Sequence, residues 1–180
     1  YPGELAAVLF CQGCPWHCPY CHNRHLQSGV SDELIPWQDL LAFLERRRGL
    51  LDAVVFSGGE PTMQPAIVDA VRIVRGMGFM VGLHTAGPYP HVLQAMLPWL
   101  DWIGMDIKAP FEDYWLITGC GNSGERARQS AEIVRQSGIA HQFRTTVHPL
   151  LMEKARLERV RSMVELEWQS VFKEQQMVFN

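Results

Sequence analysis

The chain has 180 residues, of which 47% are hydrophobic and 19% charged, and its formal net charge is −3. This size and composition predict one ordinary globular domain and exclude a disordered chain. The basic run 46–48 is typical of a solvated helix face rather than a nucleic-acid surface, and neither a membrane-spanning run nor a signal peptide is visible. We therefore expect a cytoplasmic protein without nucleic-acid or membrane partners.

Apolar segments alternate along the chain with segments of helical periodicity. The expected strands cover 5–10, 53–56, 79–83, 102–105 and 142–147, and a weaker sixth falls within 168–180. The expected helices begin at Pro36, near Pro65, near Val92, at Asn122 and near Leu157. Repeated strand–helix units predict an α/β fold with a parallel sheet, either a closed or partial barrel or an open doubly wound sheet. The continuous apolar run 5–10 predicts a strand covered on both faces.

Every unusual motif in the sequence follows an expected strand. The motifs are the cysteine-rich segment 11–23, then Ser57–Pro61, His84–Gly87, Asp106–Lys108 and His148. Parallel sheets bind their ligands at the carboxyl ends of the strands. We therefore expect these distant motifs to meet in one site at that rim.

The cysteines are clustered, because four of the five lie between Cys11 and Cys21. Thiolates select iron–sulfur clusters, zinc or copper(I). The spacing C-x3-C-x2-C of Cys14, Cys18 and Cys21 would leave one iron of a four-iron cluster open for a substrate or cofactor. Adding Cys11 would instead close a structural zinc site or a four-Cys electron-transfer cluster. The spacing alone leaves both alternatives open.

The residues around these cysteines resemble a motif of a known protein family. The segment Cys11–Asn23 closely resembles the cluster loop of the radical S-adenosylmethionine (SAM) superfamily, especially its glycyl-radical-activating branch. The resemblance implies a [4Fe-4S] cluster whose metal ligands are Cys14, Cys18 and Cys21. It also implies that Tyr20 helps to hold the adenine of SAM. The position of Cys11 is not a family ligand, which favours a buried thiol there.

The next two rim motifs also resemble superfamily segments. Gly58-Gly59-Glu60-Pro61 resembles the segment that holds the SAM amino group, and glycines would let backbone carbonyls approach an ammonium while Glu60 adds negative charge. Alone, this motif would also fit a plain strand–helix turn. Thr85 matches a third-strand motif whose acid helps to bind a cation near SAM in the formate-lyase-activating branch. His84 replaces that acid, so His84 is either a site contact or a structural histidine.

The fourth and fifth strands end in two further matches. Lys108 resembles a lysine that could pair with the SAM carboxylate, although an ion pair with Asp106 is the alternative. Arg144 lies within an expected strand, where a charge is costly unless it is paired, and a bidentate contact to a carboxylate or ribose edge would suit it. His148 is the remaining candidate, near the adenine.

The resemblance implies a partial (βα)6-type TIM barrel of parallel strands and a single radical SAM domain over 1–180. Residues 1–150 match well, and 151–180 are truncated or divergent. It implies reductive cleavage of SAM to a 5′-deoxyadenosyl radical that abstracts hydrogen from a glycine of a glycyl-radical enzyme, anaerobic ribonucleoside-triphosphate reductase in particular. The electron donor would be a flavodoxin or ferredoxin, and no protein residue is needed as an acid or base. The alternatives are another radical SAM substrate and a closed four-Cys metal module.

Overall fold

The computed structural model describes residues 1–148 and 153–176. Its six strands are β1 (Ala6–Cys11), β2 (Ala53–Gly58), β3 (Met80–Thr85), β4 (Trp102–Asp106), β5 (Ala140–Val147) and β6 (Phe172–Gln176). Its helices are α1 (Trp37–Glu45), α2 (Ile67–Gly76), α3 (Pro90–Met96), α4 (Tyr114–Thr118), α5 (Ser123–Gln136) and α6 (Lys154–Ser162). No helix in these described ranges is both long and apolar enough to cross a membrane.

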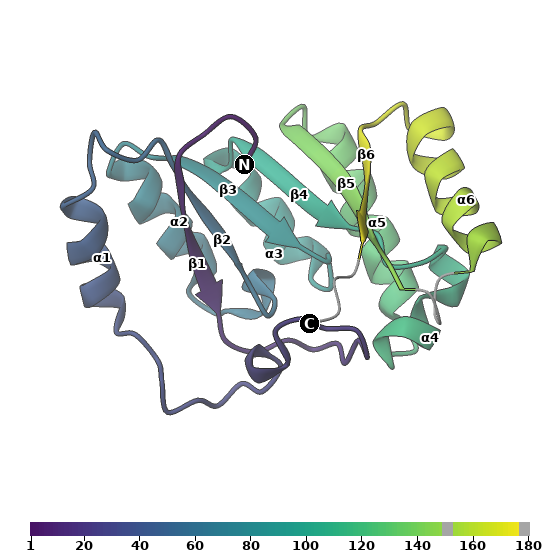
Figure 1. Cartoon of the computed structure of the whole chain (residues 1–180). Helices are drawn as coiled ribbons and strands as arrows, with labels where there is room; N and C mark the ends of the chain where they lie inside the picture. The colour runs from purple at the N-terminus through teal and green to yellow at the C-terminus, as the bar shows by residue number, and fades with distance from the viewer. Residues whose placement is uncertain (149–152, 177–180) are drawn as a thin grey trace.

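The strands form one parallel sheet in the order β1-β2-β3-β4-β5-β6, curved as an open half barrel (Figure 1). Consecutive parallel strands need a crossover, and the helices supply it on the outer face. The prediction of a partial (βα)6 barrel is therefore confirmed. The weak sixth strand is present, whereas the short helix α4 falls in a segment for which the sequence predicts no element.

The apolar core lies between the sheet and its outer helices. Strand residues that face these helices are fully buried, among them Leu83, Met105 and Phe143. They pack against apolar helix residues, namely Val71, Val74, Leu93, Ala127, Ala131 and Val134. Because side chains alternate along a strand, the residue after each of these core positions faces the inner, concave side. His84, Asp106 and Arg144 are those next residues, so core packing fixes their direction.

The first strand differs from its expected environment. Val8 is 44% exposed and Phe10 is 59% exposed, so β1 is covered on one face only, and the prediction of a strand buried on both faces is wrong. The reason is position, because β1 is an edge strand of a sheet that does not close. At the amino end of the sheet, the Tyr1 ring packs on the concave face and stacks on Trp102 at 5.6 Å between centroids.

Candidate active site

The cysteine loop, defined here as residues 12–28 after β1, folds back on itself through backbone hydrogen bonds. The Gly13 N–H donates to the Leu26 carbonyl at 2.8 Å, and the Cys14 N–H donates to the Gln27 carbonyl at 3.1 Å. A third bond, from the His17 N–H to the Thr118 carbonyl, ties the loop to the end of α4. The loop therefore runs across the carboxyl ends of the strands, from β1 towards α4 (Figure 1).

Two glycines at the end of β2 let a second motif contact this loop directly. The Gly59 N–H donates to the Cys11 carbonyl at 2.9 Å, and the Glu60 N–H donates to the Gly13 carbonyl at 2.8 Å. A Cβ on Gly59 would lie 2.2 Å from the Gly13 oxygen, and one on Gly58 would lie 2.3 Å from the Cys11 nitrogen. Gly58 also has a φ of 113°, which favours glycine. Glycine is thus required at both positions for the glycine turn and the cysteine loop to pack together.

Glu60 points into the protein rather than into open space. Its Oε1 accepts hydrogen bonds from the Thr62 N–H, the Thr62 hydroxyl and the Thr85 hydroxyl at 3.0, 2.6 and 2.7 Å. Its Oε2 accepts from the Ala86 N–H at 2.9 Å. Burial raises the pKa of Glu60, and these hydrogen bonds oppose the shift. Glu60 and Thr85 therefore join the rim ends of β2 and β3.

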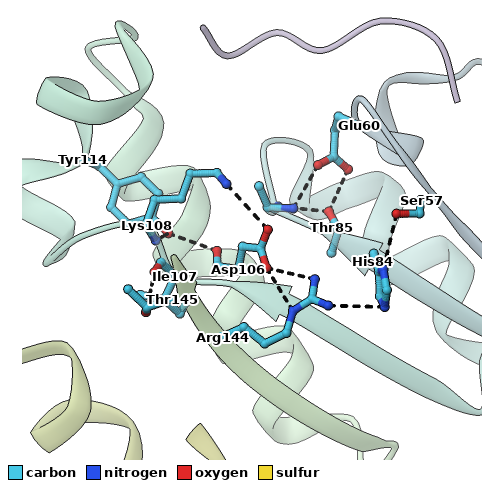
Figure 2. A network of polar contacts seen from close by, with 12 residues as sticks. Ser57, Glu60, His84, Thr85, Asp106, Ile107, Lys108, Tyr114, Arg144 and Thr145 are labelled. Atoms are coloured by element: carbon cyan, nitrogen blue, oxygen red, sulfur yellow. Dashed lines mark hydrogen bonds and ion pairs between the residues drawn. The ribbon is translucent and has the colours of Figure 1, made fainter. Parts of the chain in front are cut away.

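A polar array crosses the concave face from β2 to β5 (Figure 2). Arg144 donates to Asp106 Oδ1 from Nε at 3.0 Å and from Nη2 at 2.9 Å, and Nη1 lies 3.3 Å from His84 Nε2. The guanidinium has only donors, so His84 Nε2 must be the acceptor. The His84 proton then resides on Nδ1, which lies 3.3 Å from the Ser57 hydroxyl. His84 is therefore a structural contact that also borders the site.

Burial and charge set the ionisation of this array. Burial, together with the Arg144 guanidinium, lowers the pKa of His84 to about 4, so the imidazole is neutral near pH 7. Burial alone would raise the pKa of Asp106, but Arg144 and Lys108 outweigh it and hold the pKa below its usual value. A carboxylate thus lies between two cations, and the rim keeps a net positive charge.

Lys108 and Tyr20 adjoin this array at the rim. Lys108 Nζ lies 3.6 Å from Asp106 Oδ2 and 6.0 Å from the centre of the Tyr20 ring. The Lys108 backbone N–H donates to the Tyr114 hydroxyl at 3.0 Å, and this bond holds the backbone after β4 against the first residue of α4. Tyr20 in turn stacks on His148, with 5.9 Å between ring centroids. The ion pair with Asp106 is present, and it leaves Lys108 at the cavity wall.

One cavity gathers most of the predicted site residues. Its walls include Cys14, Cys18, Cys21, Tyr20, Gly58, Gly59, Thr85, Lys108 and Arg144. Glu60 points away from it, and His148 reaches it through its contact with Tyr20. Ser57, Asp106 and Trp16 line the same cavity, and the sequence motifs assigned none of them a cofactor-binding role. The alternation of strand residues could have found Asp106, which is paired in register with Arg144.

Cys11 is placed apart from the other loop cysteines. It ends β1 and lines an apolar hollow with Leu9, Trp37 and Phe56, beneath the outer helices. Burial raises its pKa to about 12, as expected for a thiol among apolar neighbours. Within 1–148 and 153–176, no three His, Cys, Asp or Glu side chains converge on one metal ion.

A half barrel of parallel strands with three cysteine thiols at its carboxyl rim defines a class of iron–sulfur enzyme folds. A model of the Radical SAM superfamily matches residues 8–166, and the chain belongs to this superfamily. Its members use a [4Fe-4S] cluster and SAM, and these are the cofactors of this chain. The three thiols on one cavity wall fit the donor set of such a cluster.

Similar proteins agree with this membership. A Methanocaldococcus jannaschii protein assigned as a glycyl-radical enzyme activating enzyme is 29% identical over 177 residues, covering 92% of this chain and 70% of its own. The pyruvate formate-lyase-activating enzyme of Clostridium pasteurianum is 29% identical over 171 residues, with the same coverages. The structure of Streptococcus suis SuiB bound to S-adenosylmethionine matches with a TM-score of 0.76 at 13% identity, over 98% of this chain but only 41% of SuiB. This chain is therefore a radical SAM enzyme similar to glycyl-radical activases.

The glycine contact predicts a steep steric effect at Gly59. Gly59→Ala should lower the free energy of unfolding by about 1–3 kcal/mol, because the new Cβ overlaps the Gly13 carbonyl. Gly76→Ala, at the end of α2 with open space around it, is the matched control and should change stability by less than about 1 kcal/mol. Urea unfolding of both variants checks this, and equal stabilities would contradict it.

The neutral state of His84 predicts a pH dependence of stability. Because the pKa of His84 is about 4 in the fold and about 6.5 in the unfolded chain, the unfolded state binds more protons between these values. The contribution of His84 is therefore complete above about pH 6.5 and declines as the pH falls towards 4. His84→Gln keeps an acceptor for Arg144 but does not titrate.

We expect the wild type to lose more unfolding free energy than His84→Gln between pH 7.5 and 4.5. The difference should be on the order of 1–3 kcal/mol. Anaerobic urea unfolding of the iron-free protein at several pH values measures it. Parallel curves for the two proteins would show that His84 is not held neutral.

Proposed function

We propose that this chain is a glycyl-radical activase whose [4Fe-4S] cluster is held by Cys14, Cys18 and Cys21. The observation that carries the proposal is the shared cavity, where these three thiols meet the glycine turn of β2 and the charged rim of β4 and β5. Cys11 lines a separate apolar hollow, which supports a three-thiolate site with one open iron over a closed four-Cys module.

Each rim motif has a binding role in this proposal. The glycine turn offers backbone carbonyls at close range to the SAM amino group, while Glu60 holds the turn in place through Thr85 and Ala86. Lys108 and Arg144 place positive charge on the wall for the SAM carboxylate or ribose edge, with Asp106 fixing the direction of Arg144. The rings of Tyr20 and His148 form a stacked pair for the adenine.

The chemistry comes from the cofactors, and the protein positions them. Cys14, Cys18 and Cys21 would hold the cluster, which would supply the electron for the reductive cleavage of SAM. In this proposal, the chain's own residues bind and orient SAM at the cavity wall. No side chain has to move a proton, so the proposal assigns no acid or base.

A glycine of a partner enzyme is the proposed hydrogen donor. The support is the likeness to two activating enzymes, together with a sheet whose edges β1 and β6 leave the concave face open to a macromolecular loop. Anaerobic ribonucleoside-triphosphate reductase is the proposed partner, and a flavodoxin or ferredoxin is the proposed electron donor. The alternative is a peptide substrate of another kind, since the SuiB fold is also known with its precursor peptide SuiA bound.

SAM cleavage tests the core of the proposal. After anaerobic reconstitution with iron and sulfide, reduction and addition of SAM, we expect 5′-deoxyadenosine from the wild type and none from Cys18→Ala. Cys11→Ser should keep both its iron and its activity, because Cys11 lies outside the cavity. Absence of product from a fully loaded, reducible wild-type cluster would refute radical SAM chemistry here, and loss of iron in Cys11→Ser would favour the closed site.

The partner requires a separate experiment. Incubation of the loaded chain with reduced donor, SAM and the anaerobic reductase should produce a glycyl-radical EPR signal in the reductase. Substitution of the radical-bearing glycine of the reductase by alanine should abolish the signal but not SAM cleavage. Efficient SAM cleavage without any radical in the reductase would direct the search to another protein or peptide substrate.

A further inference from the structure

Two buried polar atoms of the cysteine loop lack a hydrogen-bond partner within the described residues. They are the indole Nε1 of Trp16, a residue only 1% exposed, and the hydroxyl of Tyr20, which is 5% exposed. Burying a donor without an acceptor is energetically costly, and native proteins rarely do so. These two donors therefore call for acceptors that residues 1–148 and 153–176 do not supply.

Both donors belong to the segment that carries the three thiols. Trp16 lies between Cys14 and Cys18 in the sequence, Tyr20 lies between Cys18 and Cys21, and both side chains line the cavity with all three cysteines. The backbone of Trp16 already donates a hydrogen bond to the Cys14 side chain. The loop thus places both side chains on the wall of the cavity that the three thiols also line.

The two rings are also held in place. The Trp16 ring packs edge-on against the fully buried Tyr114, with 5.8 Å between centroids. The Tyr20 ring is held on His148 by stacking, with Lys108 over its face. Fixed rings keep their donors in fixed directions, and ring stacking leaves the Tyr20 hydroxyl free for a second role.

A bound cluster would bring the acceptors these donors lack. Cysteine thiolates and inorganic sulfides both accept hydrogen bonds, and reduction adds negative charge to them. Hydrogen bonds to the sulfurs therefore stabilise the reduced state more than the oxidised state and raise the reduction potential. Both groups remain hydrogen-bond donors near neutral pH, because an indole N–H and a buried tyrosine hydroxyl keep their protons there.

We propose that the Trp16 indole N–H and the Tyr20 hydroxyl donate hydrogen bonds to sulfur atoms of the cluster held by Cys14, Cys18 and Cys21, and that they raise its reduction potential. This inference rests on the proposed cluster ligands but goes beyond them, because it assigns the ease of electron entry to two side chains that are not ligands. It separates the Tyr20 hydroxyl, directed at sulfur, from the Tyr20 ring, which faces the adenine.

The test is the midpoint potential of the reconstituted cluster, measured without SAM or partner by EPR-monitored redox titration. Tyr20→Phe and Trp16→Phe each remove a donor and keep an aromatic ring. We expect each variant to hold a full cluster whose reduced-to-oxidised ratio at a fixed potential falls about tenfold, which is a shift of about 59 mV to more negative potential. Tyr89→Phe, at the N-cap of α3, and Trp99→Phe, in the turn after α3, are matched controls and should not shift the potential.

A second readout covers the case in which Trp16→Phe disturbs the loop. Hyperfine spectroscopy of the reduced cluster in D2O should detect exchangeable protons near iron, and Tyr20→Phe should remove one of them. Unchanged potentials and unchanged proton couplings with intact clusters would overturn this inference, while SAM cleavage would continue to support the proposed function. A wild-type chain that assembles no cluster would overturn both. A shift that appears only after SAM is added would assign the donors to SAM and would also overturn the inference.

Discussion

The close contact between the glycine turn and the cysteine loop is the constraint on which the site depends. Gly59 and Gly13 are far apart in sequence, yet their backbones approach so closely that no side chain fits between them. This contact holds the cysteine loop against the end of β2. The same turn buries the Glu60 carboxylate and directs it towards Thr85 and Ala86. The backbone of the glycine turn could bind the ammonium of SAM, and the Glu60 side chain holds that turn in place.

The electrostatics of the rim follow from the alternation of the strands. Packing of Met105 and Phe143 against the outer helices directs Asp106 and Arg144 to the concave face, where they pair in register. A single carboxylate then lies between Lys108 and Arg144, and the cavity keeps a net positive charge. Such a wall is complementary to a cluster with three thiolates, whose overall charge is negative, and to the carboxylate of SAM. The neutral His84 adds an acceptor for Arg144 without adding charge.

Much of this arrangement could be predicted from the sequence because it depends on local pattern. Apolar runs and turn residues located the strands, and the rule that ligands gather at carboxyl strand ends located the rim. The exposure of Phe10 could not be predicted, because an apolar run looks the same in an edge strand and a central one. The direction of the Glu60 side chain could not be predicted from the sequence either, because its partner Thr85 lies on another strand. Likewise, only the three-dimensional structure shows that Cys11 and Cys14 face different hollows.

The same structure explains why a loop with few regular elements can support demanding chemistry. Hydrogen bonds donated by the backbone N–H groups of Gly13, Cys14 and His17 fix the path of the cysteine loop within the polypeptide itself. The buried donors of Trp16 and Tyr20 have no hydrogen-bond partner in the part of the chain that the structure describes. Because an unsatisfied buried donor is costly, any group that supplies acceptors there gains binding energy from completing the loop. In the proposed site, folding of the loop and binding of the cluster are therefore linked, because the cluster would supply acceptors to Trp16 and Tyr20.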